Sequence, residues 1–233
     1  MIRLTNVEFR YERSGFGLRV AQLHVEVGSR TVIVGPSGCG KSTLLQLVTG
    51  ILTPSTGSVV VADSELASAT DRQRRQFRIA NVGLIFQEFE LLNYLTASQN
   101  IELPWLINPS LERPRDLEGR IQKLAAELGT SGLLNRPVTR LSHGERQRVA
   151  IGRALITQPA LVVADEPTGH LDPSTRDRIV DLLFEQTRNR TLIMTTHDHS
   201  LLARFDRVID FSSPADSGIE FLTAEAASVG ETS

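Results

Sequence analysis

A glycine-rich stretch at residues 35–43, Gly-Pro-Ser-Gly-Cys-Gly-Lys-Ser-Thr, constrains the fold of this chain more than any other feature. A β-branched apolar run at 31–34 precedes it, and the apolar-rich segment after it has no helix breaker before Gly50. These flanks predict a buried strand, a loop and a helix in succession. In that context the pattern G-x-x-x-x-G-K-S is typical of a loop that binds phosphate groups through its backbone N–H groups and the helix N-terminus. The alternative is a plain glycine turn, which would not require Lys and Ser at these positions.

The residues of this loop have distinct expected roles. The set expected to contact phosphate comprises Gly35, Pro36, Ser37, Gly38, Cys39, Gly40, Lys41, Ser42 and Thr43. Lys41 is expected to reach the β- and γ-phosphates of a nucleoside triphosphate, and the Ser42 hydroxyl is expected to bind Mg²⁺. The sequence therefore predicts a nucleotide-binding protein.

Charge and composition restrict the classes of partner. The 233 residues carry a formal charge of −2, which offers no electrostatic footprint for nucleic acid. No stretch approaches the roughly 18 consecutive apolar residues that a membrane span needs. Cys39 is the only cysteine, so no internal disulfide can form and a reducing cytosol is favoured. We therefore expect a soluble protein of one large domain that does not bind nucleic acid.

Alternating apolar residues open the chain, and a different pattern follows. Residues 2–11 and 18–27 read as half-buried strands joined by a turn at 14–15, which suggests an antiparallel hairpin. After the glycine loop, short apolar runs alternate with helical segments. The expected strands are 58–61, 82–86, 161–164, 191–195 and 207–211, and the expected helices are 173–187 and 200–204. Thr70 and Gln73 are spaced as a capping box that opens a further, basic helix through Arg78. Such alternation predicts an α/β fold with a mainly parallel sheet.

The middle of the chain, residues 88–157, reads as a helical insertion into this pattern. Within it, Pro104, Pro109 and Pro114 are expected to break the helical stretch into pieces. We therefore expect one domain over 1–233, in which 1–87 and 158–233 form the core and 88–157 a helical subdomain. The tail after Ser213 is small and polar, and we expect it to be peripheral.

A second motif is expected to complete the nucleotide site. Residues 161–164 form a continuous apolar run that ends in Asp165 and Glu166. A carboxylate after a buried parallel strand lies at the sheet edge where nucleotides bind in such folds. Asp165 is expected to hold Mg²⁺, and Glu166 is suited to orient and deprotonate an attacking water molecule.

The stretch Leu141-Ser-His-Gly-Glu-Arg-Gln-Arg-Val-Ala150 resembles the signature segment, usually L-S-G-G-Q, of the ATP-binding cassette (ABC) ATPases. The other marks of that family follow in the expected order: Tyr11, the phosphate loop, Gln87, the signature, Asp165-Glu166, Gly169-His-Leu-Asp172 and His197. The resemblance covers roughly residues 1–211. It implies a RecA-like P-loop NTPase core with an N-terminal antiparallel β subdomain, an α-helical insertion, and Mg²⁺-dependent hydrolysis of ATP.

The resemblance also implies roles for single residues. Tyr11 matches the aromatic residue that stacks on adenine, Gln87 the glutamine that touches Mg²⁺ and the attacking water, and His197 the histidine at the γ-phosphate. Each has a plainer alternative: a tyrosine at the end of a strand, a surface glutamine and a structural histidine. For Gln87 and His197, the placement after a strand favours the functional interpretation, whereas for Tyr11 both interpretations stay open.

The signature and the acid that follows Gly169 are implied to contact ATP held by another subunit. The residues concerned are Ser142, His143, Gly144, Glu145 and Asp172. Here His143 replaces the usual glycine and Glu145 the usual glutamine. Two plainer roles remain open, because Ser142 and Glu145 are spaced as a capping box and Asp172 precedes Pro173 as a helix N-cap does.

One phosphate loop and one signature per chain imply a homodimer, or a pair with a second ATP-binding subunit, that sandwiches two Mg·ATP. The sequence is most similar to the branch of lipoprotein-releasing, macrolide-efflux and cell-division ATP-binding subunits. That likeness implies a separate membrane permease docked around 88–106, where Tyr94, Leu103 and Trp105 either line a docking cleft or pack the helical insertion. It also implies a location on the cytoplasmic face of the cell membrane.

Other functions remain open. A cell-division type of mechanical or regulatory ATPase that moves no solute is the main alternative. A soluble relative in DNA repair or translation would usually carry a coiled-coil insertion or two cassettes, and neither is present. A nucleotide kinase or GTPase is disfavoured by the signature, by Glu166 and by the lack of an N-K-x-D motif.

Overall fold

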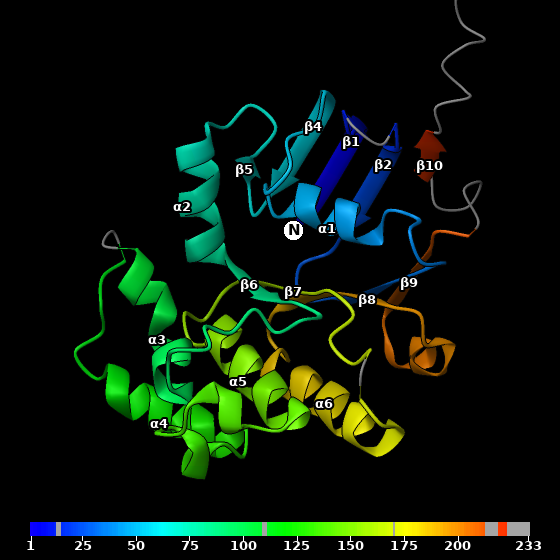
Figure 1. Ribbon diagram of the computed structural model, residues 1–233. Coiled ribbons are helices and arrows are strands. Elements are labelled where there is room, and N and C mark those ends of the chain that lie inside the picture. The colour runs from blue at the N-terminus through cyan, green and yellow to red at the C-terminus, as the bar shows by residue number, and fades with distance from the viewer. Residues whose placement is uncertain (13–14, 109–110, 170, 213–218, 223–233) are drawn as a thin grey trace, which may run out of the picture. The chain divides into compact units, whose positions relative to one another are not determined.

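The computed structural model describes residues 1–12, 15–108, 111–169, 171–212 and 219–222, and it divides into two compact units. Unit 1 comprises 1–78 and 195–233, and unit 2 comprises 79–194. Figure 1 labels the helices and strands of both units. None of the helices in the described ranges combines the length and apolar character that a membrane crossing requires.

Unit 1 contains an antiparallel sheet with the strand order β10-β2-β1-β4-β5. Its strands are β1 (Ile2–Arg10), β2 (Gly17–Val25), β4 (Thr56–Val61), β5 (Ser64–Glu65) and β10 (Ile219–Leu222). β1 pairs with β2 in the register Ile2 to Val25. The alternating apolar residues Ile2, Leu4 and Val7 are fully buried, as a period of two predicts. The predicted hairpin is confirmed, although Ser14 of its turn lies outside the described residues.

The expectation that everything after Ser213 is peripheral is wrong for β10. This strand pairs with β2 from Ile219 to Leu222, and the Ile219 side chain is fully buried. The physical reason is that Ile219, Glu220 and Phe221 are apolar, polar and apolar in turn, a pattern that suits a strand. The rest of the tail, residues 213–218 and 223–233, lies outside the described residues, so the expectation for it stays a prediction.

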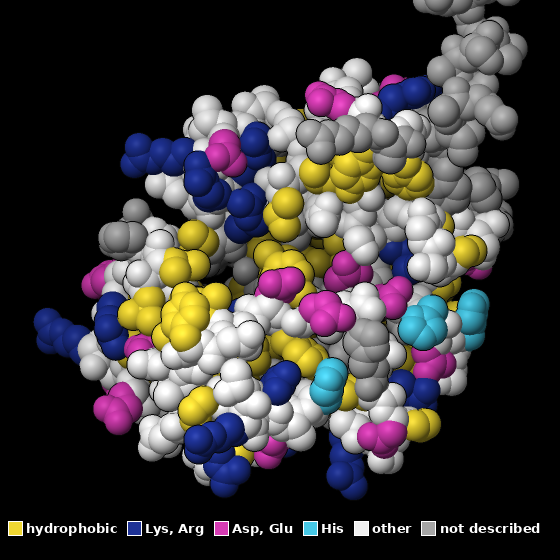
Figure 2. All heavy atoms as spheres, in the orientation of Figure 1, with side chains coloured by type: hydrophobic (Ala, Val, Ile, Leu, Met, Phe, Trp, Pro, Cys, Tyr) yellow, Lys and Arg dark blue, Asp and Glu magenta, His cyan; other side chains and the backbone are white. Residues whose placement is uncertain are grey.

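The rest of unit 1 comprises the elements on either side of the glycine loop, a 3₁₀ helix and most of helix α2. β3 (Arg30–Val34) pairs in parallel with β9 (Arg207–Asp210), and α1 (Lys41–Val48) follows the loop. A 3₁₀ helix, η3 (His199–Arg204), stands where a helix was predicted near 200–204. α2 (Asp71–Asn81) begins at the predicted capping box, in which Thr70 and Gln73 exchange hydrogen bonds. Figure 2 shows that Lys and Arg side chains gather over α2.

Unit 2 is built on a parallel sheet, as predicted. β6 (Val82–Ile85) pairs with β7 (Leu161–Ala164), which pairs with β8 (Thr191–Thr196), and both pairings are parallel. All four side chains of β7 are buried, which explains its uninterrupted apolar sequence. α5 (His143–Leu155) and α6 (Pro173–Gln186) lie on one side of these strands (Figure 1).

The helical part of unit 2 contains α3 (Ala97–Ile107), α4 (Leu117–Glu127) and two 3₁₀ turns, η1 (Ser131–Leu133) and η2 (Val138–Arg140). The predicted break at Pro104 is wrong, because this proline lies inside α3. Its ring removes one backbone hydrogen bond, but the capping box of Thr96 and Gln99 and the burial of Ala97, Asn100 and Ile101 hold the helix in place. The chain is interrupted between α3 and α4, near Pro114, while Pro109 lies outside the described residues.

Candidate functional site

The glycine loop of unit 1 has the backbone shape that a phosphate cradle requires. Gly35, Gly38 and Gly40 have φ angles of 151°, 78° and 91°, a region that side chains other than glycine rarely adopt. Cys39 donates its N–H to the Pro36 carbonyl at 3.4 Å, so the loop turns back on itself. α1 then begins at Lys41, and the first N–H groups of this helix lie at the end of the loop. The loop is therefore suited to bind an anion.

The side chains at the start of α1 differ in exposure. Lys41 is only 5% exposed, and its Nζ donates to the carbonyl oxygens of Gly35 and Pro36 at 2.9 Å each. Ser42 is exposed and Thr43 is buried. Since Lys41 already lies across the mouth of the loop, phosphate oxygens can replace the two carbonyl oxygens without moving the ammonium group far. Ser42 is exposed, so its hydroxyl is accessible, and its binding of Mg²⁺ stays a prediction.

Tyr11 lies beside this loop and is anchored by its hydroxyl. The hydroxyl lies 3.3 Å from Thr43 Oγ1 and donates to Gln46 Oε1 at 3.4 Å, so it is attached to α1. The ring makes an edge contact with Phe9, with centroids 4.8 Å apart. The Tyr11 hydroxyl thus ties the end of β1 to the helix that follows the phosphate loop, and stacking of its ring on a base stays a prediction.

His197 follows β8 and is exposed in unit 1. Two hydrogen bonds hold the next residue, Asp198, in a turn. Its N–H donates to Thr196 Oγ1 at 3.0 Å, and its Oδ1 accepts from the Ser200 N–H at 2.9 Å. This turn holds the backbone on the C-terminal side of His197.

In unit 2, the structure brings together two of the predicted catalytic side chains. A Cβ atom added to Gly169 would lie 3.7 Å from Glu166 Oε2 and 3.8 Å from Gln87 Nε2. Asp165, immediately after β7, donates its N–H to the Ile85 carbonyl of β6 at 2.9 Å. The carboxyl ends of β6 and β7 therefore hold Gln87, Asp165 and Glu166 at one edge of the parallel sheet, as such sheets do at their ligand sites.

Glu166 has a left-handed backbone with a φ angle of 42°. A residue other than glycine in this region stores about 1–3 kcal/mol of strain, and such residues concentrate at functional sites. The turn that follows is closed by the Gly169 N–H, which donates to the Glu166 carbonyl at 3.2 Å. The chain thus accepts strain at the residue that the sequence assigns as the catalytic base. His170, the next residue along this motif, lies outside the described residues.

The signature segment begins helix α5, and its capping box is present. Ser142 donates its N–H to Glu145 Oε2 at 2.7 Å, and Glu145 donates its N–H to Ser142 Oγ at 3.4 Å. The hydrogen bonds from Ser142 lower the pKa of the Glu145 carboxyl. The substitution of the usual glutamine by Glu145 therefore keeps the cap, and it places a negative charge at the positive end of the helix.

A contact that the sequence did not predict joins the signature to the segment after Gln87. The rings of Phe89 and His143 meet edge to face, with centroids 5.3 Å apart. Phe89 and Glu90 have φ angles of 61° and 48°, and both carbonyls accept hydrogen bonds from the Arg153 guanidinium of α5, at 2.7 Å for Phe89. Burial lowers the pKa of Arg153. No motif includes Arg153 or Phe89, so only the structure identifies them.

Asp172 is the N-cap of α6, the plainer of its two predicted roles. Its Oδ1 accepts from the N–H groups of Thr175 and Ser174 at 3.1 Å each, and from Ser174 Oγ at 2.7 Å. Hydrogen bonds from Thr175 and Ser174 hold the pKa of this carboxyl well below its usual range. A contact between Asp172 and another subunit stays a prediction.

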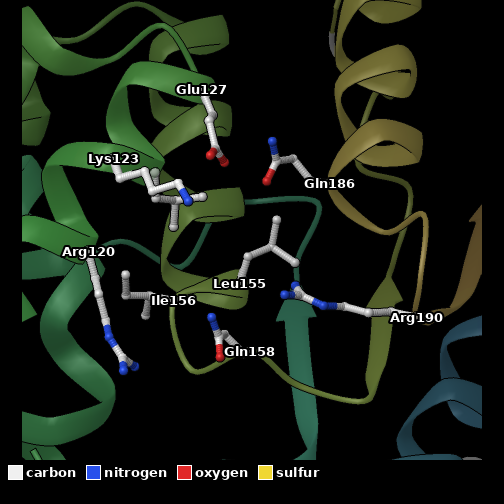
Figure 3. Close-up of a pocket in the computed structure, with 9 residues that line it drawn as sticks. Arg120, Lys123, Glu127, Leu155, Ile156, Gln158, Gln186 and Arg190 are labelled. Carbon is white, nitrogen blue, oxygen red and sulfur yellow. The ribbon is translucent and has the colours of Figure 1, made fainter. Parts of the chain in front are cut away.

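A separate pocket of about 330 Å³ in unit 2 contains none of the predicted site residues (Figure 3). The last residues of three helices line it: Glu127 of α4, Leu155 of α5 and Gln186 of α6. Arg120, Lys123 and Arg190 also line it. Helix C-termini carry partial negative charge, so cations at this place stabilise the helix ends. The pocket is therefore explained by helix packing rather than by catalysis.

Apolar side chains are exposed on α3 and just before it. Tyr94 is 80% exposed and Ile107 is 64% exposed, and Leu106 is also exposed. Figure 2 shows hydrophobic side chains gathered over this part of unit 2. Trp105 packs partly against the helical core, and its Nε1 donates to the Glu112 carbonyl at 3.2 Å. Of the three predicted docking residues, Tyr94 is thus fully available, whereas Leu103 and Trp105 are half-buried.

Comparison with known proteins identifies the family. The family model described as ABC transporter matches residues 18–169. The lipoprotein-releasing system ATP-binding protein LolD of Pseudomonas syringae pv. tomato is 44% identical over 191 residues, which cover 81% of this chain and 83% of that protein. The LolD protein of Ruegeria pomeroyi is 39% identical over 218 residues, covering 91% and 94%. An uncharacterized ABC transporter ATP-binding protein of Mycobacterium tuberculosis is 39% identical over 224 residues, covering 90% and 86%.

Solved structures agree with this assignment. A dimeric structure of the bacterial ABC transporter cassette MJ0796 has a TM-score of 0.80 and 31% identity, and the match covers 90% of this chain and 94% of that one. A second dimeric structure of the same cassette, in a post-hydrolysis state bound to ADP and Pi, has a TM-score of 0.80 and 29% identity. The predicted P-loop NTPase fold is thereby confirmed. With the family model matching most of its length, this chain belongs to the ABC transporter family, and it is an ATP-binding subunit with the ATPase activity of that family.

Proposed function

We propose that two copies of this chain close head to tail around two Mg·ATP, and that each site combines the phosphate loop of one copy with the start of α5 from the other. One chain carries a single loop and a single signature, so two sites require two copies. A two-fold symmetric interface meets this requirement with one surface. The dimeric structures of the related cassette MJ0796 support the arrangement.

The observation that carries this proposal concerns the backbone N–H groups in the first turn of α5. The capping box uses the N–H of Glu145 and that of Ser142. Among the described residues, no hydrogen bond is formed by the N–H groups of His143 and Gly144, which stand at the positive end of the helix. Two unpaired N–H groups, together with the helix dipole, form an anion site that this copy's own structure leaves available. A γ-phosphate presented by the partner copy fits that site.

Mg²⁺ is suited to the donor set that we assign to it. Ser42 offers a hydroxyl, Asp165 a carboxylate and Gln87 an amide oxygen, all of them hard oxygen ligands. The described part of the chain holds no cluster of three or more His, Cys, Asp or Glu side chains. That agrees with Mg²⁺, which keeps water and phosphate oxygens as ligands and needs only one or two carboxylates. When bound, it would neutralise charge on the β- and γ-phosphates.

The chain's own residues would then carry out hydrolysis. Glu166 accepts a proton from water and orients it for in-line attack on the γ-phosphorus, with Gln87 beside it. Lys41 stabilises the charge that develops on the phosphate oxygens. His197 fixes the geometry of the γ-phosphate. The Glu166 and Gln87 side chains both approach Gly169, and this closeness supports these roles.

The first experiment tests Glu166. Glu166→Gln is expected to bind ATP but to lower the rate of hydrolysis by a factor of about 10²–10⁴, the usual contribution of a general base. With Mg·ATP it should elute as a dimer in size-exclusion chromatography. Glu127→Gln, which changes an exposed carboxylate at the end of α4, is the control and should leave hydrolysis unchanged. Near-normal turnover in Glu166→Gln would contradict the assignment.

The second experiment tests whether the site is shared. Lys41→Ala and Ser142→Arg copies are each expected to be inactive, because every site in either homodimer has one damaged half. A mixed dimer contains one site with both halves intact, so mixing the two variants should restore part of the activity. If the activity of the mixture equals the mean of the separate variants at every ratio, the sites are not shared between copies.

We further propose that the exposed apolar residues Tyr94, Leu106 and Ile107 receive a separate membrane permease, so that the chain acts on the cytoplasmic face of the membrane. Tyr94 and Ile107 are 80% and 64% exposed, and a partner would cover this apolar surface. The relatives named as lipoprotein-releasing ATP-binding proteins support lipoprotein release or a similar efflux as the transported process.

This proposal predicts that Ile107→Asp separates the chain from its membrane partner. The variant should no longer co-purify with membranes from cells that express it, whereas ATP hydrolysis by the purified protein should persist. Val27→Asp, which alters another exposed apolar residue at a distant position in the sequence, is the matched control. Unchanged membrane association of Ile107→Asp would count against docking at this surface.

A further inference from the structure

Phe16 lies on the phosphate loop, although it belongs to no motif. It immediately precedes β2, and its carbonyl accepts the N–H of Tyr11 at 2.9 Å, which brings the two aromatic residues together across the first hairpin. Their ring centroids are 6.2 Å apart, with 41° between the ring planes. The chain therefore places two aromatic rings side by side in unit 1.

The Phe16 ring reaches the loop at its last glycine. A Cβ atom added to Gly40 would lie 2.9 Å from Phe16 Cζ and 3.6 Å from Leu18 Cδ1. Gly40 is the N-cap of α1, so the ring rests beside the point where the N–H groups of the helix converge. Leu18 is fully buried, whereas Phe16 keeps part of its surface exposed. The aromatic ring of this half-buried residue thus borders the anion-binding loop.

The Tyr11 ring borders the same loop from α1. Its hydroxyl is engaged by Thr43 and Gln46, and its edge meets Phe9. Because the hydroxyl is already bonded within the chain, Tyr11 presents mainly apolar ring surface to a ligand, as Phe16 does. Two apolar rings beside an anion cradle suit a ligand that combines phosphate groups with a flat, apolar part, which describes a nucleotide.

We propose that Phe16 is a second nucleoside-contacting residue, which forms with Tyr11 an aromatic wall for the base and ribose of ATP. The inference rests on the proposed function in that it takes a nucleoside triphosphate as the ligand of the loop. Neither ring offers a hydrogen-bonding group to the base, so the wall contributes affinity and does not discriminate between bases. Phe16 should therefore matter for ATP and GTP alike.

The test compares ligands with and without a nucleoside. Binding of ATP, GTP and inorganic tripolyphosphate, each with Mg²⁺, is measured by isothermal titration calorimetry on the full chain. Phe16→Ala is expected to raise the Kd of ATP and of GTP about tenfold, the effect of losing one stacking contact, and to change the Kd of tripolyphosphate less than twofold. Equal weakening of ATP and tripolyphosphate would overturn the proposal, since Phe16 would then act only by shaping the loop at Gly40. An unchanged Kd of ATP would also overturn it.

Two further variants keep the test decisive. Phe16→Leu retains an apolar side chain over Gly40 but removes the ring, so it should weaken ATP selectively even if Phe16→Ala fails to fold. Phe16→Trp keeps an aromatic face and should bind ATP nearly as well as the wild type. Lys41→Ala should lose both ATP and tripolyphosphate. If wild-type protein bound neither ligand, the proposed function would fail, whereas the results for Phe16 described above bear on the aromatic wall alone.

Discussion

Replacement of Arg153 by Met would remove the guanidinium that holds two strained residues in place. In the folded protein this group donates to the carbonyls of Phe89 and Glu90, both of which have left-handed backbones. A hydrogen bond from a charged donor contributes roughly 1.5–3 kcal/mol, so two contribute at least about 3 kcal/mol. Release of two left-handed residues returns about 1 kcal/mol each. We therefore expect the free energy of unfolding to fall by about 1–4 kcal/mol.

Arg153→Met should change the conformation of residues 88–91 much more than it changes the stability of the whole fold. Without the two hydrogen bonds, residues 88–91 are expected to leave the left-handed conformation, and the edge contact between Phe89 and His143 would be lost with it. Urea denaturation measures the global change. Hydrogen–deuterium exchange measures the local one, and it should accelerate in peptides covering 88–95 while the rest of α5 stays protected.

Arg146→Met is the matched control for this prediction. Arg146 lies on the same helix and also donates to two backbone carbonyls, those of Val138 at 3.1 Å and Thr139 at 3.2 Å. Its loss should leave exchange in 88–95 unchanged. The reasoning is refuted if Arg153→Met leaves that segment as protected as in the wild type, or if both variants accelerate it equally.

Two further predictions concern the same unit. The folded-state pKa of Glu145 lies below its ordinary value of 4.5, so its carboxylate stabilises the fold above that pH, and the contribution is lost as the pH falls through the lowered value. Glu145→Gln keeps a capping side chain but has no carboxylate. Its Tm should therefore depend less on pH below about 4.5 than the Tm of the wild type. Plots of Tm against pH that run parallel for the two proteins would contradict this. Ile101→Ala should lower the free energy of unfolding, measured by urea denaturation, by about 2–5 kcal/mol. The reason is that Ile101 is fully buried in the helical core and packs against Gly152. A loss below about 1 kcal/mol would show instead that the core collapses to fill the space.

Features that depend on local spacing were predicted well from the sequence. The phosphate loop, the capping boxes at Thr70 and Ser142, and the acid pair after β7 all stand where their patterns placed them. Each arises from hydrogen bonds or dihedral angles within a few residues, so the residue types alone specify it. For the same reason, the elements on either side of the loop have nearly the predicted bounds.

Features that depend on contacts between distant segments could not be predicted. The pairing of β10 with β2 joins residues about 200 positions apart. A strand of four residues carries too little pattern to predict which other strand it pairs with. Arg153 and Phe89 meet across more than sixty residues, and an arginine on a helix ordinarily indicates only a solvated face. Pro104 was predicted wrongly because the packing of α3 against the helical core outweighs one lost backbone hydrogen bond, and only the structure shows that packing.

The place of β10 at one edge of the antiparallel sheet has a practical consequence. A shortened chain that stopped at Ser212 would leave the backbone N–H and C=O groups of β2 without their partner strand from Gly17 to Val20. Such an open border attracts strands from other molecules, so trimming the apparently dispensable end would favour precipitation rather than a cleaner sample. Purification tags are therefore safer beyond Leu222 than in place of it.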